Sequence, residues 1–452
     1  MAKRSLAGFP RASPRDEGMS PQPLREIRAA TRLEVQELGS CAGVCHLILR
    51  RGRCVFLHSD GWADRKYKRP FSAGTICRLH GSTKALVSAA FLRLVDQGKV
   101  KLDDQVSKYI NFSEKVATGG GGCRPVKVKP TLRHLLTMTA GLRDTDFPGY
   151  ASVAAEIRRG KVKDLEEYCN ALAKIPLQSE PGTWYEYGLS TDFIGRICEV
   201  VSGENLNSFM RNQLLDPLGM KDTHFKLPAE KRSRVAVLYE CKETSANKRR
   251  RVGMQYTPVP WDHPDSAPGI MSSAGGALSY KDPGMWSTAS DYARFCQMLL
   301  DGGVALDGTR VLRSTTVRAV WSDGLAPFAD KHGRLANWNV DDTDGPPWEG
   351  GSWDKCGWSL INTLVQLRGA LRRRSGPARH GHSMGVGGGG GVYWLVDKKR
   401  QLVALSFQQS FDGARSDDDG LGPPGNDCTD LALAAVDQGV LLKRQQRKQK
   451  RR

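Results

Sequence analysis

The sequence predicts a mixed α/β (α+β) fold, with one antiparallel sheet that is built from both chain ends, flanked by helices and interrupted by an inserted all-helical lobe. Apolar runs at residues 43–49 and 53–59, separated by a glycine-containing turn, predict a β-hairpin near the start of the chain. Runs at 391–396 and 401–407 predict a second hairpin near the end. Between the two hairpins, apolar residues recur mainly at helical spacing.

The helical segments have apolar residues at helical spacing, and several end at glycine or proline. We expect helices at about 24–35, 81–95, 131–138, 165–175, 191–201, 204–215, 291–300 and 427–442. These elements predict one domain over residues 21–442, flanked by disordered segments at 1–20 and 443–452. Within the domain, the sheet lobe is expected at about 21–108 and 286–442, and the helical lobe at about 109–285.

The composition is that of a globular protein with an unusually basic charge balance. The chain has 452 residues and a formal net charge of +19, part of which lies in the tail from Lys443 to Arg452. Such a tail is expected to contact nucleic acid or an acidic surface, or to be solvated without a partner. No apolar run is long enough to span a membrane.

Cysteine usage bears on both compartment and metal binding. The 11 cysteines are scattered and form no Cys-x-x-Cys pair, which favours a reducing, cytoplasmic location over a disulfide framework. The basic, acid-free start from Met1 to Arg15 and the basic tail leave organellar or nuclear targeting open. No metal site and no cofactor are expected.

The segment Arg78-Leu-His-Gly-Ser-Thr-Lys84, followed by an apolar helix, is the most informative part of the chain. A serine three residues before a lysine on a helix lies on the same face and can give its proton to the amine. Here Gly81 occupies that position and the serine is Ser82. Ser82 is rotated roughly 200° around an ideal helix from Lys84. Ser82 is therefore expected either to cap the helix or to act as a displaced nucleophile.

This segment resembles the active-site turn of the β-lactamase-related family, which includes class C β-lactamases, penicillin-binding proteins and serine esterases. The family motif is Ser-x-x-Lys, and Gly81 stands at its serine position. The resemblance covers about residues 21–442 and implies a serine β-lactamase-like fold and serine-hydrolase ancestry. Further family-like strings lie at 93–98, 135–142, 181–187, 216–223 and 286–294.

The second family motif, Tyr-x-Asn, matches Tyr187-Gly-Leu189. The resemblance implies that Tyr187 relays protons between the nucleophile and the leaving group. A nearby lysine cation would favour the phenolate form, which is consistent with such a role. Leu189 replaces the asparagine that contacts substrate in the family. The alternative for Tyr187 is an ordinary packed aromatic side chain.

The third family motif lies on a strand that lines the site, and its equivalent is Val386-Gly387-Gly388. The Lys, His or Trp of the motif is lost, whereas the glycines would let a ligand approach the backbone. The resemblance implies that a backbone N–H here contributes to an oxyanion hole. Residues 385–390 also fit Gly-x-Gly-x-x-Gly, but a strand rather than a helix follows, which argues against a dinucleotide site.

Two functions follow from these motifs. Changes at Gly81, Leu189 and Val386 favour a catalytically impaired member of the family that retains a ligand cleft for a small ester or amide. The alternative is an active esterase or amidase that forms an acyl-enzyme on Ser82, assisted by Lys84 and Tyr187.

Overall fold

The computed structural model describes residues 5–6, 8–118, 120–143, 149–150, 152–153, 156, 161–244, 253–258, 284–328, 335, 356–366, 370–371, 379–380, 383–388, 390–412 and 424–449. Its centre is an eight-stranded sheet in the order β12-β13-β16-β17-β18-β3-β4-β5, in which every neighbouring pair is antiparallel. The strands are β3 (Gly43–Arg50), β4 (Arg53–Asp64), β5 (Arg69–Pro70), β12 (Cys356–Trp358), β13 (Leu364–Gln366), β16 (Ser383–Gly388), β17 (Val392–Asp397) and β18 (Leu402–Gln408).

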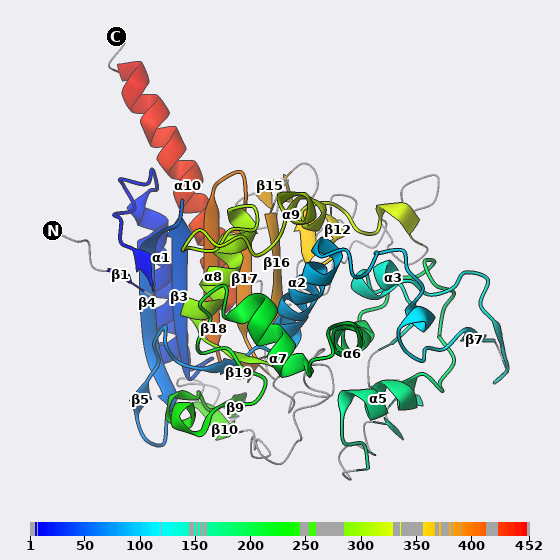
Figure 1. Cartoon of the computed structure of the whole chain (residues 1–452). Helices are drawn as coiled ribbons and strands as arrows, with labels where there is room; N and C mark the ends of the chain where they lie inside the picture. Colours follow the sequence, from blue (N-terminus) through cyan, green and yellow to red (C-terminus); the bar gives the residue numbers. More distant parts are fainter. Residues whose placement is uncertain are drawn as a thin grey trace.

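The two ends of the chain meet in the middle of this sheet. β3 and β18 pair directly, with Leu47 opposite Leu405. Both strands are buried along their whole length, because helices cover the two faces of the sheet. The prediction of a single antiparallel sheet built from both chain ends is therefore confirmed (Figure 1).

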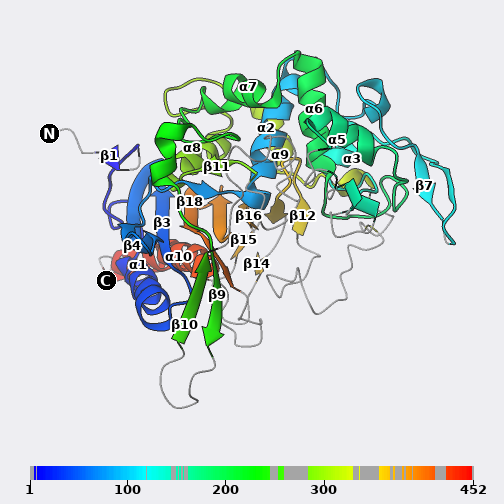
Figure 2. The same cartoon turned by 90° about the horizontal axis from the view of Figure 1, so that it is seen from below.

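Helices form a layer on each side of the sheet. Figure 2 shows α1 (Pro21–Arg32) and α10 (Pro424–Gln449) on one side, and α2 (Thr83–Asp96) and α8 (Ala289–Leu300) on the other. α1 and α10 bury a cluster that includes Ile27 and Leu433 against the sheet. These helices bury most of their apolar residues against the sheet or against another helix.

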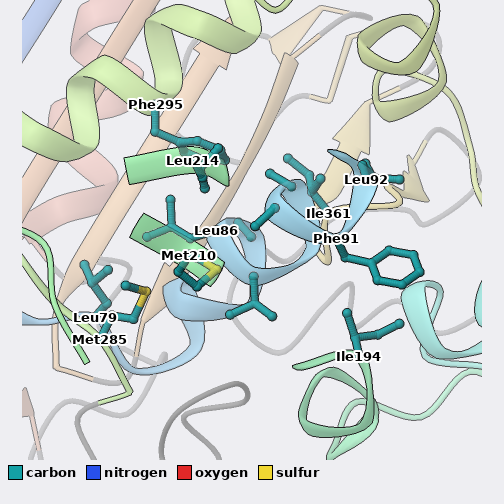
Figure 3. Packing of buried hydrophobic residues seen from close by; sticks show 14 of the residues in the cluster. Leu79, Leu86, Phe91, Leu92, Ile194, Met210, Leu214, Met285, Phe295 and Ile361 are labelled. Carbon is teal, nitrogen blue, oxygen red and sulfur yellow. The ribbon is translucent and has the colours of Figure 1, made fainter. Parts of the chain in front are cut away.

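α2 is the central helix of the larger hydrophobic cluster. Most of its residues are buried, including Leu86 and Phe91, because the helix is apolar around most of its circumference. Figure 3 shows Leu86 close to Met210 and Phe91 close to Ile194. The rigid packing of α2 fixes the position of the turn at its N-terminus.

The inserted region is mainly helical, with α3 (Leu132–Leu136), α5 (Leu165–Leu172), α6 (Ser190–Ser202) and α7 (Leu206–Met210). It differs from the expected all-helical lobe because it also contains two β-hairpins. These are β7 (Lys115–Ala117) with β8 (Cys123–Pro125), and β9 (Tyr239–Thr244) with β10 (Gly253–Pro258). The second hairpin gains a third strand, because β9 also pairs with β19 (Ser410–Asp412) from the distant C-terminal part.

The remaining elements are short. They are β1 (Ser5–Leu6), β2 (Phe9–Pro10), β6 (Cys77–Arg78), β11 (Trp286–Ser287), β14 (Ala370–Leu371), β15 (Arg379–His380), α9 (Ser314–Val320), the π-helical segments η1 (Leu33–Leu38) and η4 (Arg211–Leu215), and the 3-10 turns η2 (His80–Ser82), η3 (Val106–Lys108), η5 (Ala229–Arg234) and η6 (Ala326–Phe328). The arginine-rich stretches at 248–251 and 372–374 lie outside the described residues.

Both terminal segments differ from the expected disorder. Near the start, β1 and β2 form a small hairpin and Phe9 is fully buried. Near the end, α10 continues to Gln449, so the backbone of most of the basic tail is helical. Burial of an apolar anchor explains the first difference. Continuation from a packed helix explains the second, because extending an existing helix needs no new nucleation.

Candidate functional site

The candidate site begins at the turn before α2. His80 has a φ of 44°, a left-handed conformation that is uncommon for a residue other than glycine. Ser82 has helical backbone angles, and its side chain forms no capping hydrogen bond. The Ser82 side chain is fully buried, and its Oγ has no hydrogen-bond partner in the described part of the chain. Ser82 is therefore neither a cap nor exposed to solvent, whereas Gly81 is partly exposed.

Neighbouring segments hold this turn from two sides. The Tyr292 hydroxyl donates a hydrogen bond of 3.0 Å to the carbonyl oxygen of Ser82. Burial raises the pKa of Tyr292 well above its usual range, which keeps the hydroxyl protonated as a donor. On the other side, the backbone N–H of Met285 donates to Thr83 Oγ1 at 2.9 Å. The start of α2 is thus anchored independently of any ligand.

Lys84 and Tyr187 are adjacent, although they lie far apart in the sequence. Lys84 Nζ lies 4.6 Å from the centroid of the Tyr187 ring, in a cation–π contact. Lys84 is almost completely buried, with 1% relative exposure, and Tyr187 is half-buried. Trp358 contacts the same tyrosine, with the two rings nearly perpendicular and their centroids 6.4 Å apart. The structure therefore brings together the lysine and tyrosine of the first two motifs.

Leu189 has a different position from that expected of a substrate-contacting residue. It precedes α6 and exposes none of its surface, because it belongs to the main hydrophobic cluster. The leucine thus packs in the core beside the site. Its apolar side chain adds to burial and offers no polar group to a ligand.

The third motif lies next to the first. Val386, Gly387 and Gly388 are on β16, opposite Trp394, Tyr393 and Val392 of β17. β16 also contacts the η2 turn, so its backbone borders the segment that carries Gly81 and Ser82. All three motifs therefore lie around the N-terminus of α2.

The loop after β16 approaches the turn closely at Gly390. A Cβ atom on Gly390 would lie 2.9 Å from His80 Nε2, so no larger residue fits without displacement of that ring. The buried Gln409 joins the same segments. Its side-chain oxygen accepts from the backbone N–H of Arg78 at 2.9 Å, and its amide lies 3.4 Å from the carbonyl of Gly390.

Three residues of this region were missed by reasoning from the sequence, namely His80, Trp358 and Gln409. His80 lies inside the first motif, but nothing in its sequence signals a left-handed backbone. Trp358 lies on β12 and Gln409 lies between β18 and β19, neither within a recognisable motif, and only the tertiary arrangement places them beside Tyr187 and Arg78. No short-range signal could have found them.

A separate cavity of about 270 Å³ lies away from Lys84, between η3 and the helices α5 and α6. Its lining is mostly polar, and Asn111 is hydrogen-bonded to Asn170 across it at 3.1 Å. Among the residues that the structure describes, no group of three or more His, Cys, Asp or Glu side chains could hold a metal ion.

Comparison with known proteins identifies relatives over most of the chain. The family model Beta-lactamase matches residues 31–421. Protein Rv1367c of Mycobacterium tuberculosis is 28% identical over 385 residues, which are 83% of this chain and 88% of that protein. Esterase EstB of Burkholderia gladioli is 28% identical over 374 residues, which are 80% of this chain and 84% of the esterase.

Solved structures share the same fold. One is EstCE1, described as a hydrolase with promiscuous acyltransferase activity. It has a TM-score of 0.64 and 21% sequence identity, and the match covers 92% of this chain and 98% of EstCE1. At this level of identity, the likeness shows the fold alone.

Proposed function

Because the chain belongs to the beta-lactamase family, we propose that it is a member that has lost acyl-enzyme chemistry and binds a small ester or amide without cleaving it. The observation that carries this proposal is the state of Ser82. Its Oγ is fully buried and has no hydrogen-bond partner in the described part of the chain. A nucleophile needs both access to the substrate and a base within hydrogen-bond reach, and Ser82 has neither.

The position of Gly81 supports the same conclusion. Gly81 occupies the serine position of the family motif and is partly exposed, but it has no side chain to attack a carbonyl. Removing the nucleophile of a serine hydrolase can lower turnover by roughly 10⁶. The half-buried Tyr187 and the Gly387-Gly388 backbone would then serve as the ligand contacts, with the buried Lys84 positioned against the tyrosine ring.

The second candidate is an active esterase or amidase that uses Ser82, and the retained Lys84–Tyr187 pair favours it. Lys84 is buried against the tyrosine ring at 4.6 Å, and burying a lysine is costly unless it is compensated. Esterase EstB is similar over most of the chain, which is consistent with an ester as the ligand in either case. This candidate requires a rearrangement that exposes the Ser82 hydroxyl.

Covalent labelling distinguishes the two candidates. The intact mass of the wild-type chain is measured after incubation with a fluorophosphonate, alongside Ser82→Ala as the matched control. We expect no adduct on either chain. An adduct on the wild type that disappears in Ser82→Ala would overturn the proposal and establish the active hydrolase.

Restoring the motif tests whether the rest of the site is intact. Ser82 has right-handed backbone angles and Gly81 is not among the described residues with positive φ, so the backbone permits Gly81→Ser. We expect this variant to form the adduct and to cleave nitrophenyl butyrate, and we expect the added substitution Lys84→Met to abolish both.

Ligand-observed NMR with nitrophenyl butyrate should detect binding to the wild type and weaker binding to Tyr187→Ala. Absence of wild-type binding would contradict the retained ligand site.

A further inference from the structure

The end of α10 leaves the body of the protein as a free helix. Val440, Leu441 and Leu442 are 42%, 56% and 48% exposed, although they are apolar. Consecutive helical residues point in directions roughly 100° apart, so exposure of all three means that no element packs against this part of the helix. One to two turns earlier, Leu433 and Val436 are buried against the sheet. Figure 1 shows the C-terminal part of α10 extending beyond the rest of the molecule.

The point at which the helix leaves the body is fixed by packing. A Cβ atom on Gly439 would lie 2.0 Å from the carbonyl oxygen of Gly18, so the two backbones touch and only glycine fits. One turn earlier, the backbone N–H of Ser20 donates to the carbonyl of Ala435 at 2.7 Å. Arg400, in the turn between β17 and β18, forms an ion pair with Asp437, with 2.7 Å between Nη2 and Oδ2. The exposed residues therefore follow a rigidly held helix.

The sequence that follows this exit point is strongly basic. Lys or Arg occupies positions 443, 444, 447, 448, 450, 451 and 452, and no acidic residue lies between 438 and 452. At the same end of the sheet, Arg51 and Arg53 are exposed in the β3–β4 turn, and Lys398 and Lys399 are exposed in the β17–β18 turn. The two turns are in contact, because the backbone N–H of Arg51 donates to the carbonyl of Gln401 at 2.9 Å.

Acidic residues compensate this charge only in part. The Glu17 carboxylate forms ion pairs with both turn arginines, at 3.6 Å from Arg51 Nη1 and 3.5 Å from Arg53 Nε. Asp397 and Asp437 are both bound by the buried Arg400, and the buried Arg50 also lies near Asp397, so two buried guanidinium groups balance these two carboxylates. We use the term basic end for the exposed Arg51, Arg53, Lys398 and Lys399 together with the exposed Val440, Leu441 and Leu442 and the basic sequence that follows them.

We propose that the basic end docks on the surface of an anionic phospholipid bilayer. The cations match lipid phosphate and carboxylate groups, and the exposed Val440-Leu441-Leu442 segment matches the acyl region just beneath them. Nucleic acid would satisfy the cations but would leave the apolar segment in water. The combination of apolar and basic residues at one end therefore favours a lipid surface. Docking there would hold the protein by one end of its sheet.

Vesicle co-sedimentation tests this proposal with the full chain. Vesicles of phosphatidylcholine alone are compared with vesicles that also contain phosphatidylserine. We expect binding to the anionic vesicles at least about tenfold tighter than to the neutral ones, and a loss of that preference in high salt. Equal binding to both vesicles, or binding to neither, would overturn the proposal.

Variants separate the apolar and the electrostatic contributions. Leu441→Ser with Leu442→Ser, and separately Lys443→Gln with Arg444→Gln, should each weaken anionic vesicle binding at least about tenfold. Lys66→Gln with Lys68→Gln removes the same charge from the opposite end of β4, and Val200→Ser removes an apolar residue of 41% exposure from α6. These two controls should bind like the wild type. Thermal unfolding of every variant checks that the fold is unchanged.

A measurement of nucleic-acid binding distinguishes the proposed lipid surface from the alternative partner. Fluorescence anisotropy with a duplex oligonucleotide measures binding to the wild type and to the Leu441→Ser with Leu442→Ser variant. The proposal would be wrong if the wild type did not bind vesicles and both chains bound the oligonucleotide tightly. The partner of the basic end would then be nucleic acid.

Discussion

At the scale of single residues, the proposed loss of acyl-enzyme chemistry rests on one missing side chain and one buried hydroxyl. Gly81 supplies no oxygen, and Ser82 turns its hydroxyl into the protein interior. Lys84 and Tyr187 nevertheless stay in contact at 4.6 Å. Because this contact places a buried lysine against an aromatic face, we expect it to contribute to stability as well as to the proposed site.

This contact can be measured by a double-mutant cycle. Tyr187→Leu removes the ring, and it should cost about 1–2 kcal/mol more unfolding free energy with Lys84 present than in a Lys84→Met background. Tyr187→Phe keeps the ring face and serves as the control, with a change within about 0.5 kcal/mol. Urea denaturation gives all of these values. Equal costs of Tyr187→Leu in both backgrounds would show that the cation–π contact contributes nothing.

At the scale of elements, the molecule depends on a few buried polar junctions between helices and strands. Arg400 joins the β17–β18 turn to α10, binding Asp397 at 2.7 Å and Asp437 at 2.7 Å. Asp397 is fully buried, so its carboxylate relies on this guanidinium for compensation.

Arg400→Met should therefore lower the unfolding free energy by about 3–5 kcal/mol, because it leaves a buried carboxylate without its cation. Adding Asp397→Asn should recover part of the loss. Arg51→Met is the matched control, since Arg51 is exposed and its ion pair with Glu17 should contribute less than about 1 kcal/mol. Urea denaturation compares the variants, and a similar small loss for both arginines would contradict this account of the junction.

At the scale of the whole molecule, the central sheet joins the two ends of the chain and buries ionisable groups in doing so. His46 on β3 is 1% exposed, and burial, with a smaller effect of the neighbouring His58, lowers its pKa from 6.5 to about 3. The unfolded chain binds a proton here at mildly acidic pH, whereas the folded chain does not. Stability from a neutral His46 is thus present above about pH 6.5 and is lost as the pH falls toward about 3.

Acidification should accordingly destabilise the fold through this histidine. Between about pH 7 and about pH 5, His46 should account for a loss of about 2 kcal/mol in unfolding free energy. His46→Gln should remove that part of the pH dependence, whatever its effect on stability at neutral pH. His58→Gln is the control, because His58 is only partly buried and should change the slope less. A full pH dependence retained in His46→Gln would refute the assignment.

Local patterns in the sequence were sufficient to predict the elements that carry the fold. The alternating and continuous apolar runs at 43–59 and 391–407 predicted the strands that form the middle of the sheet, because strand side chains repeat with a short period. The apolar helix after Gly81 and the spacing of Lys84 were equally local features. Together with the family resemblance, they predicted the fold.

Only the tertiary structure decided how these local features are used. The burial of Ser82, the contact of Lys84 with the tyrosine ring and the core position of Leu189 depend on α6, α8 and β16, which come from distant parts of the chain. The same holds for the strand that β19 adds to the β9–β10 hairpin and for the exit of α10 beside Gly18. Residue type and spacing specify local conformation. The exposure of a side chain and the partner of a strand depend instead on the elements that pack against them, which come from the whole chain.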